Sequence, residues 1–263
     1  MSAVLKEQQV EISVNNVSMV FGTKEKEITA LKQVSFDVYK NEVVSLLGPS
    51  GCGKSTLLRM MTDLIHPTSG SIVVESELPR IARLQRKFGI VFQSPTLFEW
   101  RTVQQNIELP LEIMGRSKRE CSDKAKEMLE LVGLAGFEKH YPWQLSGGMQ
   151  QRVAIARALS LDPPILFMDE PFSALDEFTK EKLHLELMKI QRKTKKTIVF
   201  VTHSIPEAVF LSNRIIVLSA RPGRIHSIHE IDLGVDRKPQ IRELREYYDY
   251  ITKVRSCFYE EGE

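Results

Sequence analysis

A glycine-rich segment, residues 48–56 (GPSGCGKST), constrains the fold of this 263-residue chain more than any other feature. The segment follows an apolar run at 43–47 and opens a stretch with helical character. That strand–loop–helix setting is the one a phosphate-binding P-loop requires. Its glycines let successive backbone N–H groups point at phosphate oxygens, and the following helix adds its positive N-terminal end. The pattern favours a P-loop over a ligand-free turn, because the strand, the glycine spacing, the lysine and the serine are all present.

The P-loop prediction assigns roles to single residues. Lys54 should reach the β- and γ-phosphates of a nucleotide, and the Ser55 hydroxyl should take a Mg²⁺ position. We expect every residue of the segment to contact the nucleotide: Gly48, Pro49, Ser50, Gly51, Cys52, Gly53, Lys54, Ser55 and Thr56. Since Cys52 lies inside the loop, labelling of its thiol should be slowed by bound nucleotide.

Two further runs, 165–168 and 197–201, are nearly continuous in apolar residues, like 43–47. Such runs are typical of central strands in a parallel sheet that is covered on both faces. Each ends at a polar pair, residues 169–170 and 202–203. Because the carboxyl ends of parallel strands form the active-site edge of an open sheet, the three clusters are predicted to meet at one site.

The two acidic residues after the second run, Asp169 and Glu170, fit different tasks. Asp169 would support Mg²⁺, usually through a water molecule. Glu170 would polarise the attacking water as a general base. Alone, the pair would be equally well explained as ordinary surface acids after a buried strand, but the P-loop in the same chain favours the catalytic interpretation.

The rest of the pattern completes an α/β fold. Residues 10–21, 34–39 and 71–75 partly alternate apolar with polar side chains, which predicts half-exposed antiparallel strands. Residues 94–159 have helical periodicity, with an apolar stripe at 119–132 that stops at Gly133. We therefore expect a P-loop NTPase with a RecA-like core, an antiparallel β subdomain and an inserted α-helical subdomain at 94–159.

The last part of the chain predicts a helical tail, residues 235–263, after a single domain at 10–234. From 240 to 258 the apolar residues fall near one helical face. The residues of that face are Ile241, Leu244, Tyr248, Ile251 and Phe258. The simplest role for this face is packing against the domain.

A second anion-binding pattern narrows the family. Residues 145–151 (LSGGMQQ) place a serine and two glycines at the start of a helix, about ninety residues after the P-loop. With the run 152–159 and the acidic strand that follow, this stretch resembles the signature motif of the ABC ATPase family. An isolated Ser-Gly-Gly would be better explained as a plain helix cap.

The resemblance implies a head-to-tail homodimer in which the signature of one subunit closes over the ATP held by the other, so that two ATP molecules lie in the interface. The signature residues expected to contact ATP are Ser146, Gly147, Gly148 and Gln150. The same resemblance implies that Phe21 stacks on adenine and that Gln93 touches Mg²⁺ and the attacking water. It also makes 173–176, which ends at Asp176, the D-loop that contacts the partner subunit.

The resemblance makes His203 the switch histidine on the γ-phosphate. The chain departs from the family at Ser204, where aspartate is usual, and at Phe21, where tyrosine is commoner. The match extends over about residues 10–224. Because Ser204 follows the switch histidine directly, its replacement of aspartate puts a dimer contact and the level of activity in question.

Composition fits a protein that works beside a membrane without crossing it. The 36 basic and 34 acidic side chains give a net charge of +2, which argues against nucleic-acid binding. No apolar run approaches the roughly 18 residues of a membrane span, and segment 1–9 lacks the apolar core of a signal peptide. Three widely spaced cysteines favour a reducing cytosol. We expect a peripheral protein on the cytoplasmic face of the membrane.

Two local segments, 98–103 (FEWRTV) and 218–225 (LSARPGRI), are similar to the nitrate/sulfonate/taurine importer ATPases. In that group proline usually precedes the tryptophan, whereas here Glu99 precedes Trp100. The resemblance implies a separate membrane permease, gripped by the surface of 94–116, and an extracytoplasmic solute-binding protein. For 221–224, a turn with solvated arginines is the alternative explanation.

Two other functions are alternatives to a transporter subunit. One is a soluble ABC-type ATPase that acts on nucleic acid, and the near-neutral charge argues against it. The other is a non-hydrolysing module that uses ATP only to dimerise. The presence of both Glu170 and His203 argues against that module.

Overall fold

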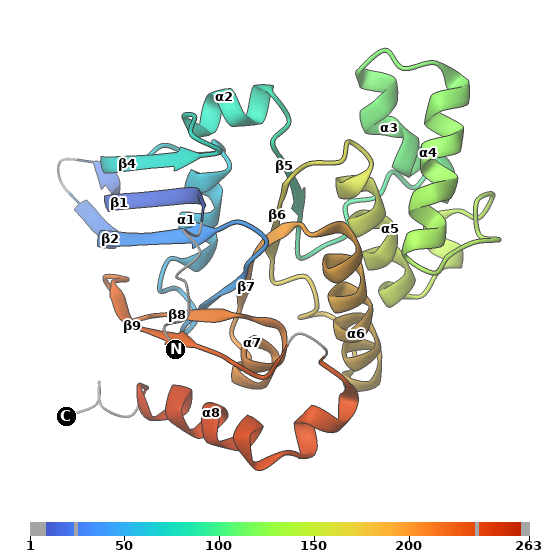
Figure 1. Ribbon diagram of the computed structural model, residues 1–263. Coiled ribbons are helices and arrows are strands. Elements are labelled where there is room, and N and C mark those ends of the chain that lie inside the picture. The colour runs from blue at the N-terminus through green and yellow to red at the C-terminus, as the bar shows by residue number, and fades with distance from the viewer. Residues whose placement is uncertain (1–8, 24–25, 235–236, 259–263) are drawn as a thin grey trace.

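The computed structural model describes residues 9–23, 26–234 and 237–258, arranged around two β-sheets (Figure 1). Parts of two sequence predictions, residues 1–8 and the tail positions 235–236 and 259–263, lie outside the described residues. The smaller sheet is antiparallel, in the order β2-β1-β4. Its strands are β1 (Val10–Thr23), β2 (Lys26–Tyr39) and β4 (Ser69–Val74). The three predicted antiparallel strands are confirmed, although β2 begins earlier than predicted because its first half also pairs with β1.

The larger sheet has the order β5-β6-β7-β3-β8-β9. The first five strands run parallel and β9 is antiparallel to β8. Their bounds are β5 (Phe88–Val91), β6 (Ile165–Asp169), β7 (Thr197–Thr202), β3 (Val43–Leu47), β8 (Arg214–Leu218) and β9 (Ile225–Glu230). The predicted central strands β3, β6 and β7 are confirmed. The other three strands of this sheet were not predicted.

Two hydrophobic cores lie on opposite faces of the larger sheet. In β7, Ile198 and Phe200 belong to one core, while Val199 and Val201 belong to the other. The first core packs under α6 (Glu177–Thr194), α7 (Ile205–Leu211) and α8 (Arg245–Ser256). The second contains α1 (Lys54–Met61) and the inner face of the antiparallel sheet. Burial on both faces explains why the central strands are apolar without alternation.

Helices occupy most of the chain between β5 and β6, where helical periodicity was predicted. They are α3 (Val103–Ile113), α4 (Lys118–Leu131), the 3₁₀ turn η1 (Pro142–Gln144) and α5 (Gly147–Leu159). The predicted helix 119–132 is α4, which begins at a reciprocal cap between Ser117 and Glu120. Figure 1 shows α3 and α4 projecting from one end of the molecule, whereas α5 returns toward the sheet. A short helix, α2 (Pro79–Leu84), joins the antiparallel sheet to β5.

The C-terminal segment differs from the prediction in its buried face. A 3₁₀ turn, η2 (Pro239–Glu243), ends at the extended residue Leu244, and α8 starts directly after it. The buried side chains of α8 are Tyr247, Ile251 and Val254, whereas Leu244 and Tyr248 are 49% and 57% exposed. The helix does not run through Leu244, so residues 241 and 244 do not continue its face, and the buried Tyr247 donates its hydroxyl to the Pro206 carbonyl at 2.9 Å. Only Ile251 of the predicted helical face is buried within α8.

Candidate active site

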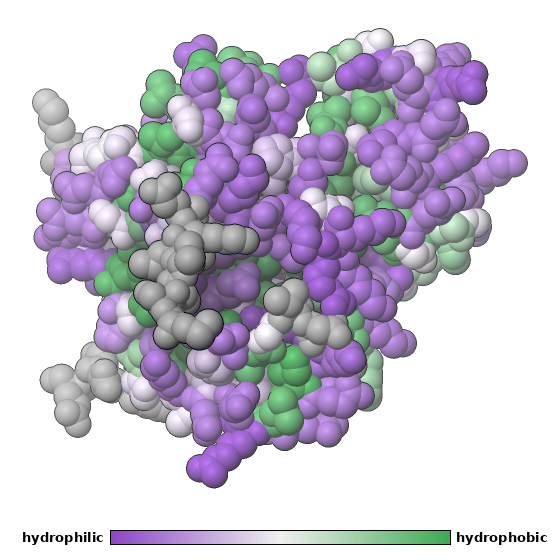
Figure 2. All heavy atoms as spheres, in the orientation of Figure 1, coloured by the Kyte–Doolittle hydropathy of each residue, from purple (hydrophilic) through white to green (hydrophobic). Residues whose placement is uncertain are grey.

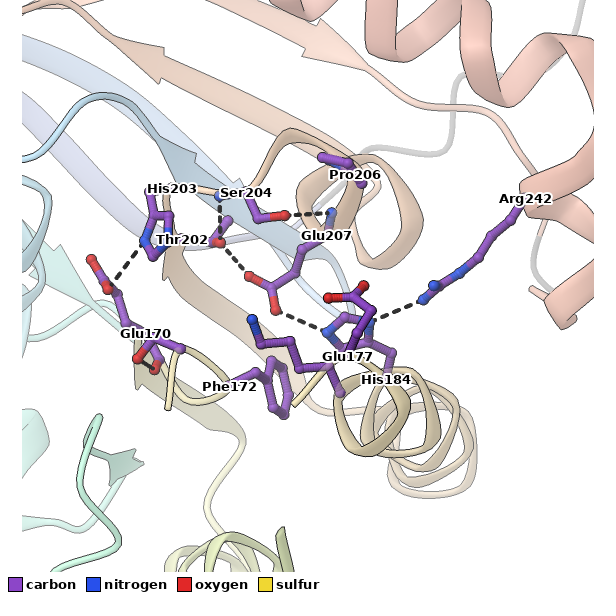
Figure 3. Close-up of a pocket in the computed structure, with 12 residues that line it drawn as sticks. Glu170, Phe172, Glu177, His184, Thr202, His203, Ser204, Pro206, Glu207 and Arg242 are labelled. Atoms are coloured by element: carbon purple, nitrogen blue, oxygen red, sulfur yellow. Dashed lines mark hydrogen bonds and ion pairs between the residues drawn. The ribbon is translucent and has the colours of Figure 1, made fainter. Parts of the chain in front are cut away.

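The three polar clusters predicted to converge do meet at the carboxyl edge of the parallel sheet. The Ser55 hydroxyl donates to Asp169 Oδ1 at 2.7 Å, which joins the loops after β3 and β6. His203 Nδ1 lies 3.3 Å from Glu170 Oε2, which joins the loops after β6 and β7 (Figure 3). The adjacency of β3, β7 and β6 in the sheet produces both contacts.

The P-loop is folded around the side chain of Lys54, which is only 5% exposed. Its Nζ donates to the carbonyls of Gly48 and Pro49 at 2.7 and 2.9 Å. The loop turns into α1 at Gly53, whose φ of 97° is a conformation that other residues adopt only with strain. The loop therefore places its ammonium group and the first turn of α1 together at the sheet edge.

Cys52 does not fit the labelling expectation drawn from its position in the loop. Its side chain is 1% exposed, and burial raises the pKa of its thiol although Lys54 acts in the opposite direction. The thiolate is the reactive form of cysteine, so this thiol should react slowly whether or not a nucleotide is bound. Protection by ATP is therefore not a useful test of this loop.

Glu170 has a strained backbone, with φ at +46°. Its amide donates to the Val201 carbonyl at 3.1 Å, which fixes the residue against β7. Non-glycine residues in the left-handed region are uncommon and cluster at functional sites. The strain turns the carboxylate toward His203, whose side chain is 57% exposed. An acid held this way can accept a proton from a water that enters beside the histidine.

Gln93 is connected to Glu170, at the carboxyl edge of the parallel sheet, through one residue, Ser173. Its Nε2 donates to Ser173 Oγ at 3.0 Å, and that hydroxyl donates to the Glu170 carbonyl at 3.0 Å. The segment after β5 and the loop after Glu170 are therefore linked through the Ser173 hydroxyl.

Two predicted partner-contact positions serve as helix caps. Asp176 accepts a hydrogen bond from the Thr179 backbone amide at 3.0 Å at the start of α6. Hydrogen bonding by the Thr179 side chain, and then by its backbone amide, lowers the pKa of the Asp176 carboxyl. Ser204 accepts one from the Glu207 amide at 3.4 Å at the start of α7. Serine therefore supplies the capping oxygen that aspartate would supply at this position, which explains how the departure from the family pattern is accommodated locally.

Phe21 lies near the end of β1, where its side chain is 42% exposed. Two residues earlier, Met19 pairs with Leu31 of β2, and the Leu31 side chain packs directly on Gly53 of the P-loop. The antiparallel sheet thus brings this aromatic ring to the neighbourhood of the loop. An exposed ring in that place is available for stacking.

The signature segment lies on the other face of the parallel sheet from α1, as the division of the two cores and Figure 1 show. Ser146 caps α5 by accepting from the Met149 amide at 3.3 Å. Gly147 and Gly148 form its first turn, and the Gln150 side-chain Nε2 donates to the Pro142 carbonyl at 2.9 Å. One chain therefore carries two anion-binding helix ends that do not face each other.

Two groups that hold the loops of the site in place were not predicted from the sequence. Arg157 of α5 donates to the Pro95 and Thr96 carbonyls at 2.9 and 2.8 Å, holding the segment that follows Gln93. Its signal is a single charged side chain inside the apolar run 153–159.

The second support is the turn between β8 and β9. A Cβ on Gly223 would lie 1.9 Å from the Cys52 carbonyl oxygen, so this glycine packs directly on the P-loop. Arg221 Nη2 comes within 3.2 Å of the position a Cβ would take on Gly51. Both arginines of the turn are exposed, as a solvated turn would have them, but the turn also braces the loop.

Comparisons with known proteins agree with this geometry. The ABC transporter family model matches residues 31–173. An uncharacterized ABC transporter ATP-binding protein from Methanocaldococcus jannaschii is 46% identical, covering 96% of this chain and 93% of its own length. The chain belongs to the ABC transporter family.

The predicted family, the P-loop NTPase fold, the ATPase activity and the cofactors ATP and Mg²⁺ are thereby confirmed. The chain is also 43% identical to the aliphatic sulfonates import ATP-binding protein of Bacillus anthracis, over 94% of this chain and 95% of the relative. The nitrate import ATP-binding protein of Synechocystis is 41% identical, over 94% of both chains.

Among solved structures, a dimeric bacterial ABC transporter cassette is similar with a TM-score of 0.74 and 38% identity. The match covers 84% of this chain and 98% of that one. A post-hydrolysis dimer of the same kind, bound to ADP and phosphate, matches with a TM-score of 0.72 and 36% identity.

Proposed function

We propose that this chain is the ATP-hydrolysing subunit of a solute importer, in which two copies close head to tail around two ATP molecules. The observation that carries the proposal is the joining of the P-loop, Asp169, Glu170 and His203 at one sheet edge. The signature helix end lies on the other face, so it can cover a nucleotide only on a second copy. A dimeric relative in the post-hydrolysis state supports this arrangement.

In the proposed site each group has one task. Lys54 and the backbone N–H groups of 48–56 hold the phosphates, and Phe21 stacks on the adenine. Glu170 takes the proton of the attacking water while Lys54 and His203 stabilise the charge that develops on the γ-phosphate. The partner subunit adds its signature residues and the D-loop that ends at Asp176. Loss of the γ-phosphate removes contacts that only the closed dimer makes, so the dimer reopens.

Mg²⁺ suits the donors present at this edge. A hydroxyl (Ser55), a carboxylate (Asp169) and an amide oxygen (Gln93) are hard oxygen ligands of the kind this ion prefers together with phosphate oxygens and waters. Within the described residues, no group of three or more His, Cys, Asp or Glu side chains could hold a metal by itself. When bound, the ion would neutralise phosphate charge.

We also propose a division of the chain into an ATPase domain at 10–234, with 94–159 as its helical insertion, and a tail at 235–263. The mutual packing of α3, α4 and α5 supports the insertion. The packing of α8 on α7 supports a tail that lies against the domain.

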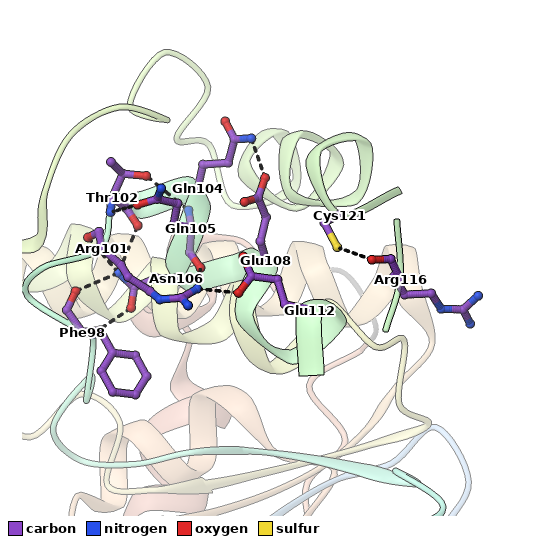
Figure 4. A network of polar contacts seen from close by, with 10 residues as sticks. All are labelled: Phe98, Arg101, Thr102, Gln104, Gln105, Asn106, Glu108, Glu112, Arg116 and Cys121. Atoms are coloured by element: carbon purple, nitrogen blue, oxygen red, sulfur yellow. Dashed lines mark hydrogen bonds and ion pairs between the residues drawn. The ribbon is translucent and has the colours of Figure 1, made fainter. Parts of the chain in front are cut away.

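The surface of 94–116 is the proposed contact with a membrane permease. Phe98 and Trp100 are exposed, with ring centroids 4.9 Å apart, and Ile113 is 74% exposed. The buried Asn106 fixes this surface, because its Oδ1 accepts from the Phe98 amide at 2.8 Å and its Nδ2 donates to the Arg101 carbonyl at 3.1 Å (Figure 4). Figure 2 shows a face made mostly of hydrophilic residues, with small apolar patches over α2 and beside α3.

No helix among the described residues is long and apolar enough to cross a membrane. Because relatives are named import ATP-binding proteins, the proposed importer includes a separate permease and, for solute capture, an extracytoplasmic binding protein, with this chain on the cytoplasmic face. Because relatives are named for sulfonate, taurine and nitrate import, we propose a small anionic or zwitterionic solute of that kind.

Replacing the proposed base tests the hydrolytic site. Glu170→Gln should bind ATP like the wild type yet lose about 10²–10⁴-fold in hydrolysis rate, the usual contribution of a general base. Phosphate release and size-exclusion chromatography with ATP measure both effects, and the variant should run as a closed dimer. Glu246→Gln, exposed on α8, is the matched control. Normal hydrolysis by Glu170→Gln would show that Glu170 is not the general base.

Purification from solubilised native membranes tests the partner. A multispanning permease that copurifies and changes the ATPase rate is the expected result. A chain that is active alone and indifferent to membranes would instead favour a soluble ATPase.

A further inference from the structure

A chain of polar contacts connects the C-terminal segment with the loop that carries His203. Arg242 Nη2 lies 3.1 Å from His184 Nδ1, and His184 Nε2 lies 2.8 Å from Glu207 Oε1. The other oxygen of Glu207 accepts from the hydroxyl of Thr202, the residue directly before His203. Figure 3 shows the four side chains leading away from His203, from Thr202 through Glu207 and His184 to Arg242. We call Arg242, His184, Glu207 and Thr202 the tail–switch network.

The middle of the network is buried. The side chains of His184 and Glu207 are 4% and 10% exposed, and Arg242 is 22% exposed. Phe172 and Phe210 contact the His184 ring, and the Arg242 guanidinium lies 4.4 Å above the Phe210 ring. In such an interior an unmade hydrogen bond is costly, so the members hold one another in place.

The chemistry of the groups fixes the direction of each bond. A guanidinium can only donate, so His184 Nδ1 must accept from Arg242. The proton of the neutral ring is then on Nε2, which donates to the Glu207 carboxylate. Glu207 accepts again from Thr202. The donor and the acceptor of each bond in the network are therefore fixed, and removing any member leaves a neighbouring side chain without its hydrogen-bond partner.

One end of the network is attached to the loop that carries His203, and the other end lies in the C-terminal segment. At one end, the Thr202 hydroxyl also accepts from the Ser204 amide at 3.0 Å, so it ties down the backbone on both sides of His203. At the other end, Arg242 belongs to η2 and also pairs with Glu181 of α6. The C-terminal segment is thus joined to the switch loop through buried polar contacts rather than apolar packing alone.

We propose that Arg242 and His184 are positioning residues for hydrolysis: they hold the switch loop so that His203 faces Glu170. The inference rests on the role proposed above for His203. It gives the C-terminal segment a function in setting the hydrolysis rate, in addition to packing.

The first test compares two arginines of the same segment. Arg242→Ala should lower kcat about 3–10-fold and leave the KM for ATP unchanged, because the network contacts the switch loop and not the P-loop. Arg242→Lys, which keeps the charge but not the fork of donors, should fall in between. The control is Arg245→Ala, whose side chain is 94% exposed and pairs with Asp249 across one helical turn, so it should behave as wild type.

The second test asks whether the two ends act through one path. Thr202→Val keeps the shape of the side chain and removes its hydroxyl. Arg242 and Thr202 are separated by two intervening side chains, so their effects on kcat should multiply if they act independently. Under the proposal, the double variant should lose about as much kcat as the more damaging single variant.

The proposal that the tail–switch network positions His203 fails if kcat of Arg242→Ala equals that of Arg245→Ala. It also fails if the two effects multiply in the double variant. A parallel fall of kcat, ATP affinity and the unfolding midpoint in Arg242→Ala would contradict it too. The last would show packing only. His203→Ala separates this inference from the proposed function. Normal hydrolysis by His203→Ala would remove the role of the histidine itself, whereas an inactive His203→Ala beside a normal Arg242→Ala would remove only the network.

Discussion

Single residues in this protein act mainly by shaping backbone. Glu170 carries a positive φ that points its carboxylate at His203, and Gly53 carries one that turns the P-loop into α1. The acid could be chosen from the sequence because two carboxylates follow a buried strand. Its strain could not, since a φ value depends on the neighbouring strand that fixes the amide.

Gly223 gives a prediction at this scale. Gly223→Ala should push Cys52 outward, because the added carbon would lie 1.9 Å from its carbonyl oxygen. We expect at least a ~10-fold loss of ATP affinity, measured by fluorescent-nucleotide titration, since misplaced loop amides no longer converge on the phosphates. Arg224→Ala, an exposed change on the same turn, should bind ATP normally. Equal affinities in the two variants would show that the turn does not brace the loop.

At the scale of elements, the sequence predicted strands best where both faces are buried. β3, β6 and β7 are nearly continuous apolar runs, and the sheet places them side by side. β8 has the same kind of run, Arg214–Leu218, and could have been found by the same rule. β5 has only four residues, and in β9 each isoleucine is followed by two polar residues, so neither strand shows a strand pattern and their assignment depends on pairing with β6 and β8.

Arg157 links two of these elements and gives a stability prediction. Arg157→Lys should lower the free energy of unfolding by about 1–3 kcal/mol, because the two carbonyls are bound by two different nitrogens of the guanidinium fork, Nη2 to Pro95 and Nη1 to Thr96, and lysine lacks that fork. Urea denaturation measures the change. Arg119→Lys on α4, whose side chain is 93% exposed, should be neutral. Equal stability of both variants would mean that water replaces the lost bonds without cost.

At the scale of the whole molecule, the two anion-binding helix ends lie on opposite faces of one sheet. Which motifs the chain carries could be predicted from the sequence. Their separation in space could not, because it follows from the order in which six strands assemble. In the proposed dimer, the P-loop of each copy faces the signature helix end of the other copy.

A bulky charge at the signature tests that assembly. In the Glu170→Gln background, Ser146→Arg should abolish ATP-dependent dimerisation while each monomer still binds ATP at its P-loop. Light scattering during size-exclusion chromatography, with and without ATP, measures the oligomer. Ser117→Arg removes an equivalent helix cap on α4 and should leave the dimer intact. A dimer that survives Ser146→Arg would contradict the head-to-tail arrangement.

The contacts of Lys54 have a further consequence, for the entropy of ligand capture. Its ammonium group already binds two carbonyls of its own loop, so the loop is held in a curled shape by an internal cation. Binding of a polyphosphate would therefore not have to order a flexible P-loop. The polyphosphate would replace the neutral Gly48 and Pro49 carbonyls as acceptors for the ammonium protons, and its charged oxygens make the stronger bonds. Most of the ordering cost of recognition is therefore met during folding, which leaves more of the phosphate contact energy to appear as affinity.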